Sequence, residues 1–130
     1  MTKDEHIQYW KRMAIRDWQT VLALHETHQN MQALFFVHLV IEKLLKAYFV
    51  KDNLENTPPV THNLEGLYNQ SNLELDPELI ERLSIINGWN IEGRYQDYKD
   101  KFYKLCTDEY VKEKILEANE LMTCLLQDLP

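Results

Sequence analysis

The stretch MQALFFVHLVIEKLLKAYFV, from Met31 to Val50, decides the fold because it is apolar around nearly its whole circumference. Its polar positions are only Gln32, His38, Glu42, Lys43 and Lys46. A helix of this kind needs neighbours on several sides, so it predicts the central helix of a helical bundle. A membrane span would need about 20 apolar residues with few charges, and the ionisable residues inside this stretch argue against one.

The polar exceptions in this helix follow a regular order. His38, Glu42 and Lys46 recur every four residues, which stacks them along one side, and Lys43 lies beside them. Charge stripes usually mark solvated faces, which favours an exposed seam with an ordinary Glu42–Lys46 ion pair worth about 0.3 to 0.5 kcal/mol. The alternative is that the stripe forms one wall of a groove.

The composition indicates a single all-α domain over residues 1–130. The chain is 45% hydrophobic and 27% charged, which is ordinary for a globular protein that buries its own core. Only three glycines and four prolines are present, which leaves little room for many tight turns. No segment alternates apolar and polar residues over the length of a strand, whereas several show helical spacing.

Charge and cysteine content exclude some classes of function. A formal net charge of -7 argues against broad binding to a phosphate backbone, although it leaves a local basic pocket open. Cys106 and Cys124 show no metal-ligand spacing, so no zinc site, other metal or disulfide framework is expected, and no cofactor is indicated. The first residues carry no apolar signal core, which makes the cytoplasm the expected location.

Start and stop signals divide the rest of the chain into helices. Thr2 and Glu5 form a possible capping box for a helix that runs to about His28. Thr61 or Asn63 can cap a short helix that ends near Asn69, after the Pro58–Pro59 pair. The signals therefore predict a helical hairpin followed by a short extra helix.

The C-terminal half carries two more helices of the predicted bundle. Asp76 is expected to cap a helix that begins at Pro77 and stops at Asn87–Gly88. Residues 88–107 predict a loop followed by one helical turn, and Thr107 is expected to cap the last helix. Its apolar seam consists of Val111, Ile115, Ala118, Met122, Leu125 and Leu129. The predicted fold is an up-and-down four-helix bundle with a short extra helix.

Three motifs in order along the chain resemble the HEPN domain. They are HLVIEKLLKAYF from His38, the Thr61-His62-x-Leu64 motif, and the Arg94-Tyr95 pair with Asp97. The resemblance covers nearly the whole chain and implies a five-helix domain of bacteria and archaea that is usually a homodimer. It also implies that many relatives are encoded beside a minimal nucleotidyltransferase, as its partner or as a toxin with an antitoxin, and that many others are metal-independent ribonucleases.

The ribonuclease signature of the family is incomplete here. That signature is an Arg followed, after four to six residues, by a His, with the two copies of the dimer meeting across a cleft. Arg94 matches the Arg, but the chain has no histidine after His62. Lysine, with an ordinary pKa of about 10.4, replaces imidazole poorly in proton transfer, so ribonuclease activity is not expected. A displaced imidazole from His62 or His38 stays open as an alternative.

The resemblance and the residues together favour a non-catalytic binding module. As a homodimer it would bind a nucleotide or a nucleic-acid end, dock a minimal nucleotidyltransferase, or do both. Arg94 would contact a phosphate or carboxylate with both arms of its fork. The other candidate ligand-binding residues are His38, Glu42, Lys43, Lys46, His62, Tyr95, Asp97 and Tyr98. Tyr95 or Tyr98 could stack on a base or accept a modification.

Structural roles for Arg94 and His62 are the alternatives. Arg94 could instead pair with Glu42 or Asp97 to fasten a loop, and His62 could hydrogen-bond at the start of the short helix. Two other functions remain alternatives for the whole chain. One is an endoribonuclease toxin that uses Arg94 with a displaced His, and the other is a purely structural assembly protein.

Overall fold

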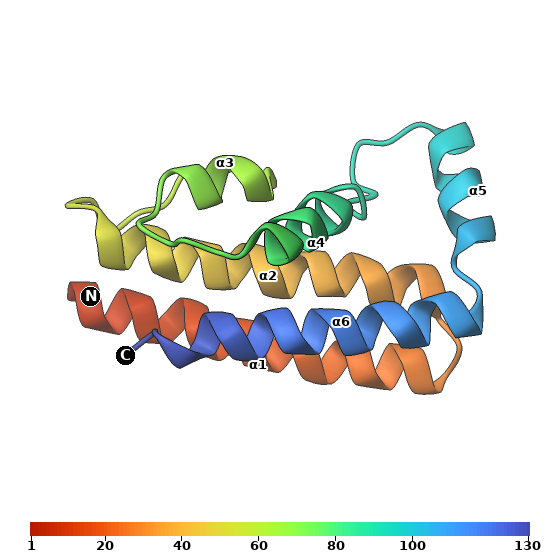
Figure 1. The fold of residues 1–130 in the computed structure, drawn as a ribbon, viewed down its shortest axis with the longest axis horizontal. Helices are drawn as coiled ribbons and strands as arrows, with labels where there is room; N and C mark the ends of the chain where they lie inside the picture. Colours follow the sequence, from red (N-terminus) through yellow and green to blue (C-terminus); the bar gives the residue numbers. More distant parts are fainter.

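The computed structural model describes all 130 residues and contains six helices and no strand (Figure 1). The helices are α1 (Lys3–Glu26), α2 (Asn30–Asp52), α3 (Leu64–Asn69), α4 (Pro77–Asn87), α5 (Gln96–Leu105) and α6 (Asp108–Gln127). The predicted all-α fold is confirmed. None of these helices combines the length and the apolarity that crossing a membrane would require.

α1 and α2 form the predicted antiparallel hairpin. The capping box at the start of α1 is present: Thr2 Oγ1 accepts from the Glu5 amide, and Glu5 Oε1 accepts from the Thr2 amide, each at 3.2 Å. The chain reverses through His28, whose φ of 60° lies in the left-handed region, before α2 begins. The hairpin therefore places the whole length of α1 against the central helix.

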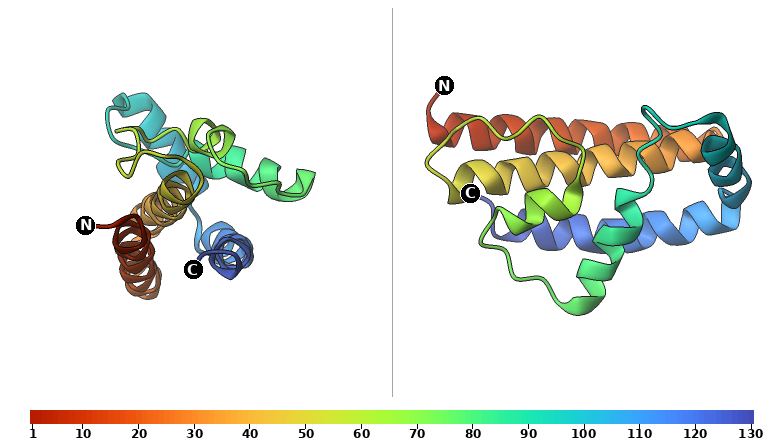
Figure 2. Two further views of the ribbon diagram at one scale, coloured as in Figure 1. Left: turned by 90° about the vertical axis from the view of Figure 1, so that its left-hand side faces the viewer. Right: turned by 90° about the horizontal axis from the view of Figure 1, so that it is seen from above.

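α2 is the central helix, as its sequence predicts. It lies between α1 and α6 on one side and α3 and α4 on the other (Figures 1 and 2). The seam of α6 packs on α2, and the Tyr48 hydroxyl donates to the Leu125 carbonyl oxygen at 2.7 Å. The apolar residues of α2 that have no exposed surface form the middle of the core, and they are Ala33, Leu34, Val37, Val40, Ile41, Leu44, Leu45, Ala47 and Val50.

Besides Thr2, the sequence signals for helix starts are correct at two further positions and wrong at one. Asn63 caps α3 by accepting from the Gly66 amide, and Thr107 caps α6 by accepting from the Tyr110 amide, both at 3.2 Å. The expected cap at Asp76 is wrong, because its side chain makes no capping hydrogen bond. Pro77 at the first position starts α4 without it, since its ring presets the helical φ.

Residues 96–105 form a ten-residue helix, where the sequence predicts a single helical turn. α5 stands at the end of the bundle, roughly across the direction of the long helices (Figure 1). Its N-terminus has no side-chain cap, which is why the start signals do not reveal it. Trp89 and Phe102, two aromatic residues of this part of the chain, are buried in the core.

We expect Leu44→Ala to lower the free energy of unfolding by about 2 to 5 kcal/mol, because Leu44 is fully buried and the change leaves a cavity. Leu54→Ala is the matched control. Its side chain is almost fully exposed, so it should change stability by less than about 0.5 kcal/mol. Urea unfolding of both variants measures the difference, and equal losses would contradict the position of α2 in the core.

Candidate functional site

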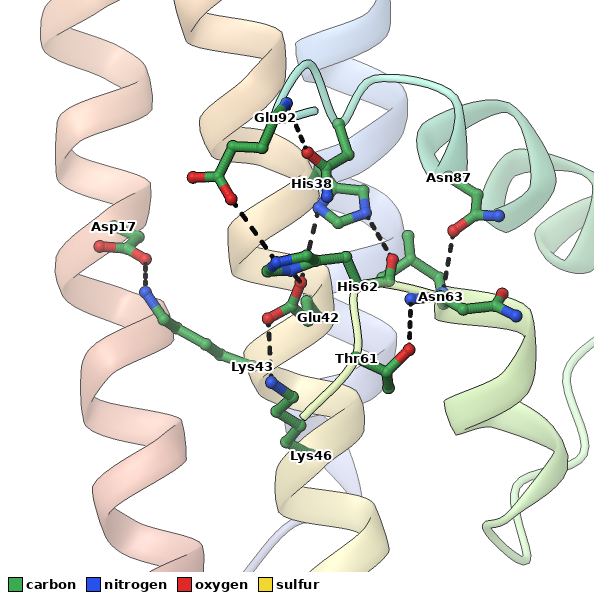
Figure 3. A network of polar contacts seen from close by, with 12 residues as sticks. Asp17, His38, Glu42, Lys43, Lys46, Thr61, His62, Asn63, Asn87 and Glu92 are labelled. Atoms are coloured by element: carbon green, nitrogen blue, oxygen red, sulfur yellow. Dashed lines mark hydrogen bonds and ion pairs between the residues drawn. The ribbon is translucent and has the colours of Figure 1, made fainter. Parts of the chain in front are cut away.

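The polar stripe of α2 is buried. His38, Glu42 and Lys46 retain 0%, 4% and 8% of their accessible surface, so the interpretation as a solvated seam is wrong. The segment before α3, around Thr61 and His62, lies over this side of the helix and covers it (Figure 3). The three side chains of the stripe are therefore the part of an internal polar network that α2 contributes.

Glu42 is the centre of this network. Its Oε1 accepts a hydrogen bond from His62 Nδ1 at 2.7 Å, and its Oε2 accepts one from Lys46 Nζ at 3.1 Å. A carboxylate only accepts, so Nδ1 of His62 carries the hydrogen and this imidazole has a fixed tautomer. A buried carboxylate is tolerated only when it is paired in this way.

His38 connects α2 to the backbone of the covering segment. Its Nε2 lies 3.0 Å from the His62 carbonyl oxygen and must donate to it, because a carbonyl only accepts. Its Nδ1 has no hydrogen-bond partner and lies 3.8 Å from Glu42 Oε1. Burial lowers the pKa of His38 and outweighs the opposite effect of the Glu42 charge. His38 is therefore a neutral, structural histidine at neutral pH.

The two lysines of the stripe are engaged within the chain. Lys43 turns toward α1, where its ammonium donates to the carboxylate of Asp17 (Figure 3). Lys46 pairs with Glu42, and its ammonium also lies 5.3 Å from the centre of a Trp10 ring. Sequence reasoning missed Asp17 as a partner, although a carboxylate at an apolar position of α1 was the signal for one.

His62 joins the network to the loop between α4 and α5. Its Nε2 lies 3.5 Å from Glu92 Oε2, a loose electrostatic contact rather than a hydrogen bond. The helix-entry role expected for His62 is wrong, because its ring bonds to Glu42. Asn63 caps α3 instead, and Asn87 accepts from the Leu64 amide at 2.9 Å. Nothing in the sequence pointed to Glu92.

Arg94 lies in the same loop and is exposed. Its Nε donates to the Asn90 carbonyl oxygen at 3.2 Å, and its guanidinium carbon lies 4.4 Å from the centre of the Tyr98 ring. Arg94 forms no ion pair, so the alternative in which it is tied to Glu42 or Asp97 is wrong. Its two terminal Nη groups make no hydrogen bond within the chain, so they are free to bind a ligand with the geometry of a fork.

The side chains that follow Arg94 differ in whether they are already bound within the chain. The Tyr98 hydroxyl donates to the Gly88 carbonyl oxygen and its ring supports Arg94, so this tyrosine is engaged. The Tyr95 side chain is 85% exposed and is available to a ligand. Asp97 accepts only from the Tyr98 amide, at 3.0 Å. The predicted site residues thus divide into a buried network and an exposed Arg94–Tyr95 pair.

The structure gives little support for metal binding or for a reactive cysteine. No group of three or more His, Cys, Asp or Glu side chains is placed to hold a metal ion. Both cysteines are free thiols, and burial raises the pKa of Cys106 to about 11, which keeps it protonated and unreactive at neutral pH. The exposed guanidinium is the feature of the site that can bind a ligand most directly.

Comparison with known proteins identifies the family of this chain. The family model described as the HEPN domain matches residues 7–129. The chain belongs to the HEPN domain family, and the resemblance drawn from its motifs is confirmed. Searches of curated proteins and of solved structures found no match.

Protonation of His38 should make stability depend on pH. The pKa of the buried imidazole is lowered, so below about pH 6.5 the unfolded chain binds more protons than the folded one, and stability falls as the pH falls. His38→Gln keeps an N–H donor for the His62 carbonyl but cannot titrate. Urea unfolding between about pH 7 and pH 5 should show a smaller loss of stability for the variant than for the wild type. Equal losses would show that His38 does not titrate in this way.

Proposed function

We propose that this HEPN protein is a non-catalytic binding module that takes a phosphate-bearing ligand, a nucleotide or a nucleic-acid end, at Arg94. The observation that supports the proposal most is the free fork of Arg94. The stem of its side chain is fixed by Asn90 and Tyr98, while both Nη groups are left without a partner. A guanidinium held in this way can bind a phosphate with two parallel hydrogen bonds and loses little conformational entropy.

The surroundings of Arg94 limit the size and type of the ligand. Tyr95 offers an exposed ring on which a base could stack. Lys43 and Lys46 are already paired with acids, so they add no free positive charge. With a net charge of -7 on the chain, one free guanidinium suits a single phosphate group better than a long backbone.

We further propose that the module acts in the cytoplasm as a homodimer and docks a minimal nucleotidyltransferase. The support is the family resemblance, which implies both a dimer and such a partner for many relatives. Mixing the purified protein with the product of a neighbouring nucleotidyltransferase gene and following the complex by light scattering tests the docking. A mixture in which the two proteins run separately would count against it.

Arg94→Ala should weaken the binding of ATP or of a 5'-phosphorylated RNA by about 1.5 to 3 kcal/mol, the range for a charge-assisted hydrogen bond. Arg94→Lys should recover only part of this loss, because a point charge cannot reproduce the fork. Lys112→Ala, which removes one exposed charge from α6, is the control and should bind normally. Calorimetric titration measures all three, and normal binding by Arg94→Ala with a lower melting temperature would sink the proposal.

A metal-independent ribonuclease is the second candidate, favoured by the pair formed by Glu42 and His62. Glu42 accepts from Nδ1, which leaves Nε2 of a half-exposed imidazole as the atom that could take a proton. A carboxylate that orients a histidine in this way is a common part of acid–base sites. Glu92 and Arg94 belong to the loop that this imidazole contacts.

We expect no RNA cleavage by the wild-type protein in the presence of EDTA, because the chain has no histidine after Arg94 to complete the ribonuclease signature. Incubation with end-labelled single-stranded RNA and gel analysis gives the answer. His62→Gln and Glu42→Gln are the variants to compare. Cleavage by the wild type that both variants abolish would replace the binding-module proposal with the ribonuclease.

A further inference from the structure

We propose that Glu92 is a positioning residue for the ligand site at Arg94, and that a proton on His62 determines whether Glu92 holds its loop in place. The loop consists of residues 88–95, between α4 and α5, and we name it the Arg94 loop. The role of Glu92 rests on the proposed function of Arg94, because it regulates that same site. It makes ligand binding depend on pH near neutrality.

The exposed part of the Arg94 loop has a single polar link to the bundle. Trp89 and Asn90 are buried and anchor the start of the loop. The amide and Nε of Arg94 donate only to carbonyl groups of the loop itself. Glu92 is the exception, because its Oε2 lies 3.5 Å from Nε2 of His62, in the segment that covers α2 (Figure 3). Through this contact the polar network can act on the exposed part of the loop.

His62 lies between two carboxylates that come from different parts of the chain. Its Nδ1 donates to Glu42 Oε1 at 2.7 Å, which leaves Nε2 without a hydrogen in the neutral ring. Nε2 then directs a lone pair at the Glu92 carboxylate, and two acceptors do not bind each other. A proton on Nε2 turns it into a donor, and the contact can shorten into a charge-assisted hydrogen bond. Protonation of His62 therefore closes the contact with Glu92, and deprotonation opens it.

The surroundings favour a proton on His62 rather than on His38. His38 has no exposed surface, and burial lowers its pKa, so it stays neutral and adds no opposing charge. The side chain of His62 is 49% exposed, and each of its ring nitrogens faces a carboxylate. Imidazole is the side chain that ordinarily gains a proton between about pH 5 and 8. The other charged groups of α1 and α2 in this network are already paired, as Glu42–Lys46 and Asp17–Lys43.

Glu92 affects the ligand site through both the loop and its own charge. When His62 holds it, the loop keeps one conformation and the imidazolium balances the carboxylate. When it is released, a free negative charge lies two residues from Arg94, where it repels a phosphate and competes for the guanidinium. A phosphate should therefore bind more tightly at pH 6 than at pH 8.

Hydrogen exchange measures the order of the loop without any ligand. The Glu92 amide donates to Asn90 Oδ1 at 2.9 Å, and the Arg94 amide donates to the Ile91 carbonyl oxygen at 3.3 Å. The protection factors of these two amides, which are already corrected for the intrinsic effect of pH, therefore report how well the loop is held. In the wild-type protein they should fall about threefold from pH 6 to pH 8, the scale of a partly exposed ion pair.

Two substitutions of Glu92 separate a held loop from a charged one. The amide of Glu92→Gln can donate to a neutral Nε2 or accept from a protonated one, so the protection should stay high at both pH values. Glu92→Ala offers His62 no partner, so the protection should be low at both. Glu113→Gln, which changes an exposed acid of α6, is the control and should keep the pH dependence of the wild type. Circular dichroism shows that each variant is folded.

Calorimetric titration with ATP connects the loop to the ligand site. From pH 6 to pH 8 the Kd of the wild type should rise about threefold more than that of Glu92→Gln, because the titration of ATP itself is common to both. Equal loop protection in the wild type at the two pH values, or the same pH dependence of Kd in Glu92→Gln, would overturn the inference and leave the proposed function intact. Absence of ATP binding at both pH values would overturn the proposed function, and loop protection alone would then decide whether His62 holds Glu92.

Discussion

The burial of the Glu42 carboxylate is the constraint on which the rest of the structure depends. A charge inside an apolar helix must be paired, and leaving such a pair without one partner costs about 3 to 5 kcal/mol. Lys46 is a partner from the same helix, but His62 reaches Glu42 only when the segment before α3 lies across α2. His38 then fastens the backbone of that segment by donating to the carbonyl of His62. One acid therefore fixes the path of the chain between two helices.

The same network reaches the exposed part of the site through one further loop. His62 contacts Glu92, and two residues later the chain presents Arg94, whose stem rests on Asn90 and Tyr98. The buried charged groups and the exposed guanidinium thus have different chemical roles, but the loop that His62 contacts is the one that carries Arg94. Because Nε of Arg94 donates to Asn90 and its guanidinium lies on the Tyr98 ring, the side chain is anchored to its own loop, which is the property that a phosphate-binding fork requires.

The sequence predicted the parts of this structure that depend on neighbours along the chain. Periodicity located the long helices, and the caps at Thr2, Asn63 and Thr107 followed from residues close to them in sequence. α5 was missed because no side chain caps its start. The burial of the α2 stripe could not be predicted, since it depends on His62, twenty residues further along. The acceptor for Arg94 is a backbone carbonyl, and such an acceptor leaves no signature in the sequence.

The polar network and the exposed guanidinium divide the charged groups of this chain between structure and ligand binding. Lys43 and Lys46 are paired with Asp17 and Glu42, so they offer no free positive charge to a ligand. Arg94 forms no ion pair and donates within the chain only to a backbone carbonyl. The ribonuclease branch of the family is expected to bring its two signatures together across a cleft. This chain supplies the arginine of that signature without its histidine, which is the reason for proposing a binding module rather than a shared catalytic centre.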